Sequence, residues 1–118
     1  MDFESLRAYC LSKKGATEDM PFGPDTLVFK VMGKMFALMP LDNTDLRLSL
    51  KNTPEKNIEL RAQHPGIQGA YHMSKKHWNM LLMSMGIPSR ITFQLIDESY
   101  NLVVKGLTKK LREELDAM

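Results

Sequence analysis

A strict alternation of apolar and polar side chains limits the folds open to this chain more than any other feature. Leu46, Leu48 and Leu50 alternate with Arg47, Ser49 and Lys51. Neighbouring side chains of a β-strand point to opposite faces of a sheet, so this order predicts a strand with one covered face and one polar face. Such strands are typical of antiparallel sheets, which can leave one face in water.

Two preceding segments extend this sheet. Residues 26–32 show the same period, and residues 35–40 are expected to return beside them after a short turn at Gly33-Lys34. Residues 41–45 are polar and should lead into the strand at 46–51. The three strands would form an antiparallel meander with one covered apolar face. The other face would carry Lys30, Arg47, Ser49 and Lys51.

Helix signals lie on both sides of the meander. We expect helices over residues 2–12, 53–64 and 89–104 and a last one from Thr108, capped by Asp2, Thr53, Ser89 and Thr108. Residues 67–71 and 77–83 should form a second pair of strands, and residues 15–25 a loop, with Phe22 tucked against the core. The order α-β-β-β-α-β-β-α-α describes an α+β fold with an antiparallel sheet of about five strands.

The bulk composition is that of an ordinary globular chain. With 118 residues, 43% hydrophobic and 25% charged, it suits one domain over residues 1–118. The single cysteine, Cys10, cannot form an internal disulfide and is expected in the core. We expect a cytoplasmic protein, because the sequence contains no signal-peptide pattern and no apolar run of membrane-spanning length. The net charge of +2 is small for a nucleic-acid binder, so any such site must be a local patch.

Residues 69–82 concentrate the groups able to bind a base or a phosphate. They contain the only tryptophan, two of the three histidines and a lysine pair. Lys75 and Lys76 are candidates for phosphate contacts, and Tyr71 and His72 for contacts with bases. Trp78 lies on a predicted strand beside Met80 and Leu82 and is expected in the core.

The same segment does not predict catalysis or metal binding. His72 and His77 are five residues apart, a spacing that places them on different faces of either a strand or a helix. The sequence contains no Gly-x-Ser-x-Gly, Walker or Gly-x-Gly-x-x-Gly motif. We therefore expect a protein that is not an enzyme and carries no metal or cofactor.

Several motifs resemble those of the MmcQ/YjbR-like family. Ser49-Leu50-Lys51 before Pro54-Glu55 resembles its strand-to-helix junction, and Tyr71-His72 with Lys75, His77 and Trp78 resembles its hallmark. Ser99-Tyr100 resembles a third signature, and Phe29-Lys30-Val31, Gly33-Lys34 and Phe36-Ala37 fit its first hairpin. The resemblance spans essentially the whole chain.

The resemblance implies a small bacterial protein with a curved antiparallel sheet and helices packed on one face. Members are often described as DNA-binding because their strands resemble a double wing, which is an argument from fold alone. The positions that the family implies as a site are Lys51, His72, Lys75, His77 and Trp78.

Three functions remain open from the sequence. The first is binding of double-stranded DNA through Lys51, Tyr71, His72, Lys75, Lys76 and His77. The second is a protein-interaction or chaperone-like module that holds a partner segment on a sheet face or a methionine-rich surface. The third is a pocket for a small ligand or substrate near His77 and Tyr100.

Overall fold

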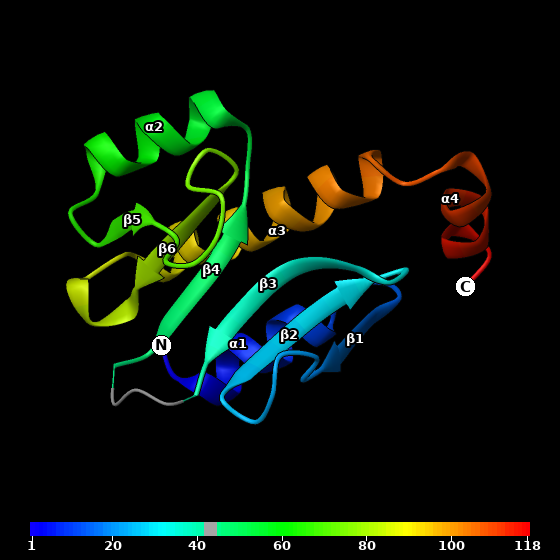
Figure 1. Cartoon of the computed structure of the whole chain (residues 1–118), viewed down its shortest axis with the longest axis horizontal. Helices are drawn as coiled ribbons and strands as arrows, with labels where there is room; N and C mark the ends of the chain where they lie inside the picture. The colour runs from blue at the N-terminus through cyan, green and yellow to red at the C-terminus, as the bar shows by residue number, and fades with distance from the viewer. Residues whose placement is uncertain (42–44) are drawn as a thin grey trace.

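The computed structural model describes residues 1–41 and 45–118, within which six strands and four α-helices form an open α+β fold (Figure 1). The helices are α1 (Phe3–Leu11), α2 (Pro54–Gln63), α3 (Ser89–Lys105) and α4 (Lys109–Asp116), with a short 3₁₀ turn at Met83–Met85. The strands are β1 (Ala16–Asp19), β2 (Thr26–Val31), β3 (Lys34–Pro40), β4 (Arg47–Lys51), β5 (Ile67–Gly69) and β6 (Trp78–Leu82). Most of the turn expected at 41–45 lies outside the described residues.

All six strands belong to one antiparallel sheet in the order β1-β2-β3-β4-β6-β5. The predicted meander of β2, β3 and β4 is confirmed, and so is the second pair. In that pair β6 lies against β4, while β5 forms the outer edge. Leu38 and Met80 are the register partners of Ser49, so β3 and β6 lie on either side of β4.

The loop predicted at 15–25 is wrong in part, because β1 forms within it and pairs with β2. The sheet therefore has six strands within the described residues, one more than the sequence suggested. β1 has the sequence Ala-Thr-Glu-Asp, and only every second residue is half-buried. A short polar edge strand of this kind carries almost no apolar signal. Arg7 on α1 secures it by donating from Nε to a Glu18 carboxylate oxygen over 2.7 Å.

The hairpin between β2 and β3 turns one residue earlier than predicted. Its two central residues are Met32 and Gly33, both in the left-handed region with φ of 50° and 80°. Two positive φ angles define the type I′ turn, whose twist matches that of the flanking strands. Lys34, expected in the turn, begins β3 instead.

Three of the four predicted helix caps are confirmed. The side chains of Asp2, Thr53 and Thr108 each accept a hydrogen bond from a backbone N–H in the first turn. The predicted cap at Ser89 is wrong. Ser89 is the first residue of α3, and Pro88 stands at the cap position without a side-chain hydrogen bond.

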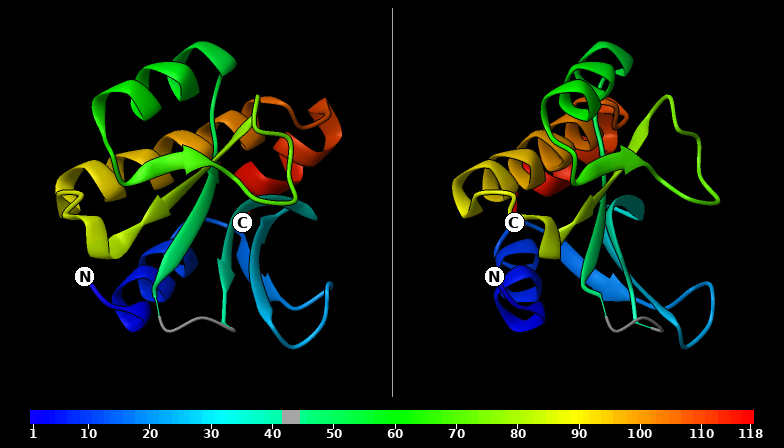
Figure 2. Two further views of the ribbon diagram at one scale, coloured as in Figure 1. Left: turned by 60° about the vertical axis from the view of Figure 1, so that its left-hand side comes forward. Right: turned by 90° about the vertical axis from the view of Figure 1, so that its left-hand side faces the viewer.

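The main core lies between one face of the sheet and the helices. Figure 2 shows α1 and α3 on this side of the sheet. Alternate strand residues, Phe29, Phe36, Leu48 and Leu81 among them, are buried there together with apolar residues of α1 and α3. Cys10 is fully buried in this core, as predicted.

A second, smaller apolar cluster covers part of the opposite face. It contains Val28, Leu38, Ala70, Trp78 and Met80. Trp78 is only 8% exposed, so its predicted core position is confirmed, on the face away from α1 and α3. The face expected to be basic is therefore a mixture of apolar and polar side chains.

Ser99 links the two halves of the sheet at the point where they diverge. Only two register pairs join β3 to β4, Ala37 with Leu50 and Leu38 with Ser49. Beyond them the hydroxyl of Ser99 lies between the strands. It donates to the carbonyl of Phe36 over 2.6 Å and accepts from the amide of Lys51 over 2.9 Å. A side chain of α3 thus replaces a ladder hydrogen bond, and β3 and β4 separate from this point (Figure 1).

Candidate functional site

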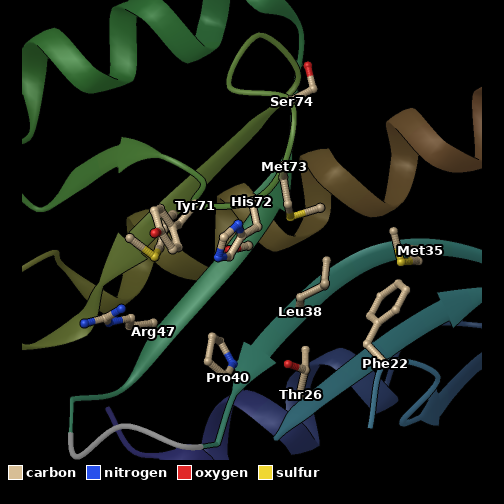
Figure 3. Close-up of a pocket in the computed structure, with 12 residues that line it drawn as sticks. Phe22, Thr26, Met35, Leu38, Pro40, Arg47, Tyr71, His72, Met73 and Ser74 are labelled. Atoms are coloured by element: carbon tan, nitrogen blue, oxygen red, sulfur yellow. The ribbon is translucent and has the colours of Figure 1, made fainter.

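A groove lies on the sheet face opposite α1 and α3. Its cavity volume is about 770 Å³. Its floor comes from β2, β3, β4 and β6, through Thr26, Met35, Leu38, Pro40, Arg47, Ser49 and Met80. Its rims come from two loops, Phe22 before β2 and residues 71–74 before β6. Figure 3 shows Tyr71 and His72 together on one side, Phe22 across from them and Arg47 at one end.

The charge of the groove is positive. Among the twelve described residues that line it, none is acidic, while Arg47 and His72 are basic. The Nε atom of Arg47 is buried and has no hydrogen-bond partner among the described residues. Apolar side chains make up most of the remaining wall. The groove therefore suits a ligand with an apolar body and a negative charge.

Residues 70–77, here called the wing loop, connect β5 to β6 and form one rim of the groove. Tyr71, His72, Lys75, Lys76 and His77 are all exposed on it. The rings of Tyr71 and His72 have centroids 3.9 Å apart at an angle of 53°. His72 has φ of 62°, a left-handed conformation that costs most residues free energy and occurs often at functional sites.

The backbone of the wing loop is held by α2. Arg61 donates from one Nη1 to the carbonyl of Lys75 over 2.9 Å and to Oδ1 of Asn79 over 2.7 Å. Asn57, only 1% exposed, donates from Nδ2 to the carbonyl of Lys76 over 3.1 Å. These bonds fix the main chain at the lysine pair and leave both ammonium groups in water.

Gly69 adds a further packing constraint on the wing loop. A Cβ placed on Gly69 would lie 2.8 Å from Cγ of Lys75. The aliphatic stem of Lys75 therefore packs on the glycine backbone while its charged end stays exposed. Long cationic side chains commonly bury their stems in this way.

The structure brings the predicted site residues together in part. Tyr71 and His72 line the groove, whereas Lys75, Lys76 and His77 lie on the outer part of the wing loop. Lys51, half-buried at the end of β4, is the register partner of Trp78 and so lies beside the start of β6. The groove and the lysines therefore form two adjacent surfaces.

Phe22 is the clearest site residue that sequence reasoning missed. It was expected to tuck against the core, yet it is 64% exposed at the rim of the groove. The signal was present, since Pro21, Gly23 and Pro24 flank it and such residues keep a turn at the surface.

The groove is not the pocket that was expected near His77 and Tyr100, because neither residue lines it. Tyr100 belongs to α3, donates its hydroxyl to the carbonyl of Lys14 over 2.6 Å and packs edge-on against Phe36 in the main core. Tyr100 therefore acts in packing α3 against the sheet.

Two other features of the described residues concern metals and membranes. No group of three His, Cys, Asp or Glu side chains there is arranged to hold a metal ion. Within residues 1–41 and 45–118, no helix combines the length and the apolar character needed to cross a bilayer.

Comparison with known proteins gives a consistent result. The YjbR family model matches residues 11–102. The chain is 39% identical over 94 residues to the uncharacterised protein YbdF of Escherichia coli O157:H7, covering 76% of this chain and 74% of YbdF. It is 29% identical over 115 residues to the uncharacterised protein YjbR of Escherichia coli strain K12, covering 98% of each chain.

Solved structures agree with these sequence matches. A crystal structure of a Deinococcus radiodurans protein with the DUF419 domain superposes with a TM-score of 0.89 at 40% identity, covering 96% of this chain and 86% of that one. A crystal structure of a Pseudomonas syringae protein gives 0.75 at 29% identity, covering 86% of this chain and 98% of that one. Fold and sequence therefore point to the same group of proteins.

Proposed function

This chain belongs to the YjbR family, and for it we propose a cytoplasmic, non-enzymatic function in binding double-stranded DNA through the wing loop. The observation that carries the proposal is the pairing of an ordered main chain with free cationic ends at Lys75 and Lys76. The two ammonium groups bind DNA phosphates. Tyr71 and His72 lie next to the bases exposed in a groove of the DNA duplex.

The hydrogen bonds between α2 and the wing loop support this role, because they reduce the entropy that the loop loses on binding. A loop that is already ordered loses little conformational freedom when it binds, so more of the interaction free energy appears as affinity. The hydrogen bonds from Arg61 and Asn57 to the carbonyls of Lys75 and Lys76 give the wing loop that order. The lysine side chains keep the freedom to adjust to phosphates in different sequences.

The types of side chain determine the mode of recognition. Lysines bind phosphates as point charges, and phosphate contacts carry no sequence information. Lys51 and His77, near the ends of β4 and the wing loop, extend the same surface. Binding is therefore expected to depend little on sequence and strongly on salt.

Fluorescence anisotropy with a labelled duplex of random sequence tests the proposal. We expect micromolar binding at low salt and weaker binding for the double variant Lys75→Ala/Lys76→Ala. A matched control, Lys109→Ala/Lys110→Ala, removes the same charge from exposed positions at the start of α4 and should bind like the native chain. Absence of binding at low salt, or an equal loss in both variants, would overturn the proposal.

A further inference from the structure

We propose that the groove is a binding site for a small aromatic molecule that bears one anionic group, such as an aromatic carboxylate. The site shares Tyr71 and His72 with the DNA surface proposed above, but it does not include the phosphate-binding lysines, because neither Lys75 nor Lys76 lines it. The inference stands on the size of the groove, the nature of its walls and the sign of its charge.

Size comes first. Pockets for small molecules usually have volumes of about 300–1,000 Å³. The groove, at about 770 Å³, lies in that range.

The walls favour a flat apolar body. Phe22 on one rim and Tyr71 on the other expose 64% and 71% of their surface. Large aromatic side chains held in water at facing rims gain free energy when an apolar group covers them, and aromatic rings pack well in stacked or edge-on arrangements. Leu38 and Met80 provide an apolar floor, and methionine adapts to guests of different shape.

The charge favours an anion. Arg47, at one end of the groove, is the one arginine or lysine among the described lining residues, and none of these residues is an aspartate or glutamate. A guanidinium binds carboxylate, sulfonate or phosphate groups through parallel hydrogen bonds. Ser49, two residues along β4 from Arg47, adds a hydroxyl group on the floor. This hydroxyl can complete the contacts of an anionic head.

The test uses two fluorescent probes of similar aromatic body. The anionic probe is 8-anilinonaphthalene-1-sulfonate, and the neutral one is N-phenyl-1-naphthylamine. We expect saturable binding of the anionic probe with one site per chain. Arg47→Met, which keeps an apolar stem and removes the charge, should weaken the anionic probe about tenfold and leave the neutral probe unchanged.

A second variant tests the rim without risk to the fold. Phe22→Ala, at an exposed position, should weaken both probes, whereas Ile58→Ala should weaken neither. Ile58 is a matched control because it is an exposed apolar residue on α2 outside the groove. Backbone amide shifts in a ¹H–¹⁵N spectrum should change on the groove floor, at Leu38, Ser49 and Met80.

The outcomes separate this site from the DNA surface. Lys75→Ala/Lys76→Ala should lose DNA binding and keep the anionic probe, and free naphthalene-2-carboxylate should displace that probe. Equal probe binding in the native chain, Arg47→Met and Phe22→Ala would overturn the inference, and so would amide shifts confined to another face. Displacement by a single-stranded oligonucleotide but not by the free carboxylate would also contradict it.

Discussion

At the scale of single residues, Trp78 joins the wing loop to the sheet. Its amide donates to the carbonyl of Ser74 over 2.9 Å, and its carbonyl accepts from Ala70 over 3.1 Å. Its side chain fills the apolar cluster with Leu38 and Met80. The sequence indicated a core residue here from alternation alone. It could not show that this core is on the face away from α1 and α3, because β6 also carries a large apolar residue, Leu81, on its other face.

Replacing Trp78 by alanine should lower the free energy of unfolding by about 3–5 kcal/mol, because a large buried side chain is lost and a cavity remains. Urea unfolding followed by circular dichroism measures this change. Tyr71→Ala removes an exposed ring from the same loop. The free energy of unfolding of this variant should stay within about 0.5 kcal/mol of that of the native chain. Near-native stability of the Trp78 variant would contradict its place in the cluster.

Cys10 gives a second residue-scale prediction, on alkaline stability. Burial raises the pKa of its thiol from 9.0 to about 12. The folded chain then keeps a proton that the unfolded chain loses, so stability is complete below the unfolded pKa and falls as pH rises from about 9 towards 12. Within that window, the native free energy of unfolding should fall more steeply with pH than that of Cys10→Ala. Equal slopes, measured by urea unfolding, would count against the buried thiol.

At the scale of elements, Ser99 of α3 links the two halves of the sheet. Its hydroxyl accepts from β4 and donates to β3 where the ladder ends. The family resemblance marked Ser99 as a signature but did not assign it a role. A role of this kind depends on three segments that are distant in sequence and meet only in the folded chain.

Ser99→Ala should lower the free energy of unfolding by about 1–3 kcal/mol, because the amide of Lys51 and the carbonyl of Phe36 lose their partner. Exchange of the Lys51 amide with deuterium should also become faster. Ser12→Ala is a suitable control, since its hydroxyl bonds the carbonyl of Tyr9 at an exposed position. If both variants had native stability and exchange, Ser99 would not be the link between the strands.

The elements also show which signals the sequence carried. β2 and β4 could be predicted because apolar and polar side chains alternate along them. The starts of α1, α2 and α4 could be predicted because each has a residue type that caps helices. β1 could not be predicted, since its four residues are mostly polar and it becomes a strand by pairing with β2. The turn at Met32-Gly33 was misplaced by one residue because a methionine with positive φ is uncommon.

At the scale of the whole molecule, two surfaces share one side of the sheet. The wing loop presents cations, and the groove beside it presents an apolar floor with aromatic rims. The motif-bearing wing loop could be found from the sequence, because its residues are contiguous. The groove could not, since four strands and two loops from residue 22 to residue 80 contribute to it.

The salt dependence of DNA binding is the sharpest test of the proposed role of the wing loop. Each phosphate contact contributes about −0.9 to the slope of log K against log salt. We expect a slope about two units shallower for Lys75→Ala/Lys76→Ala than for the native chain, and an unchanged slope for Lys109→Ala/Lys110→Ala. A native slope near zero, or the same slope in the wing-loop variant, would contradict the binding of DNA phosphates by the wing loop.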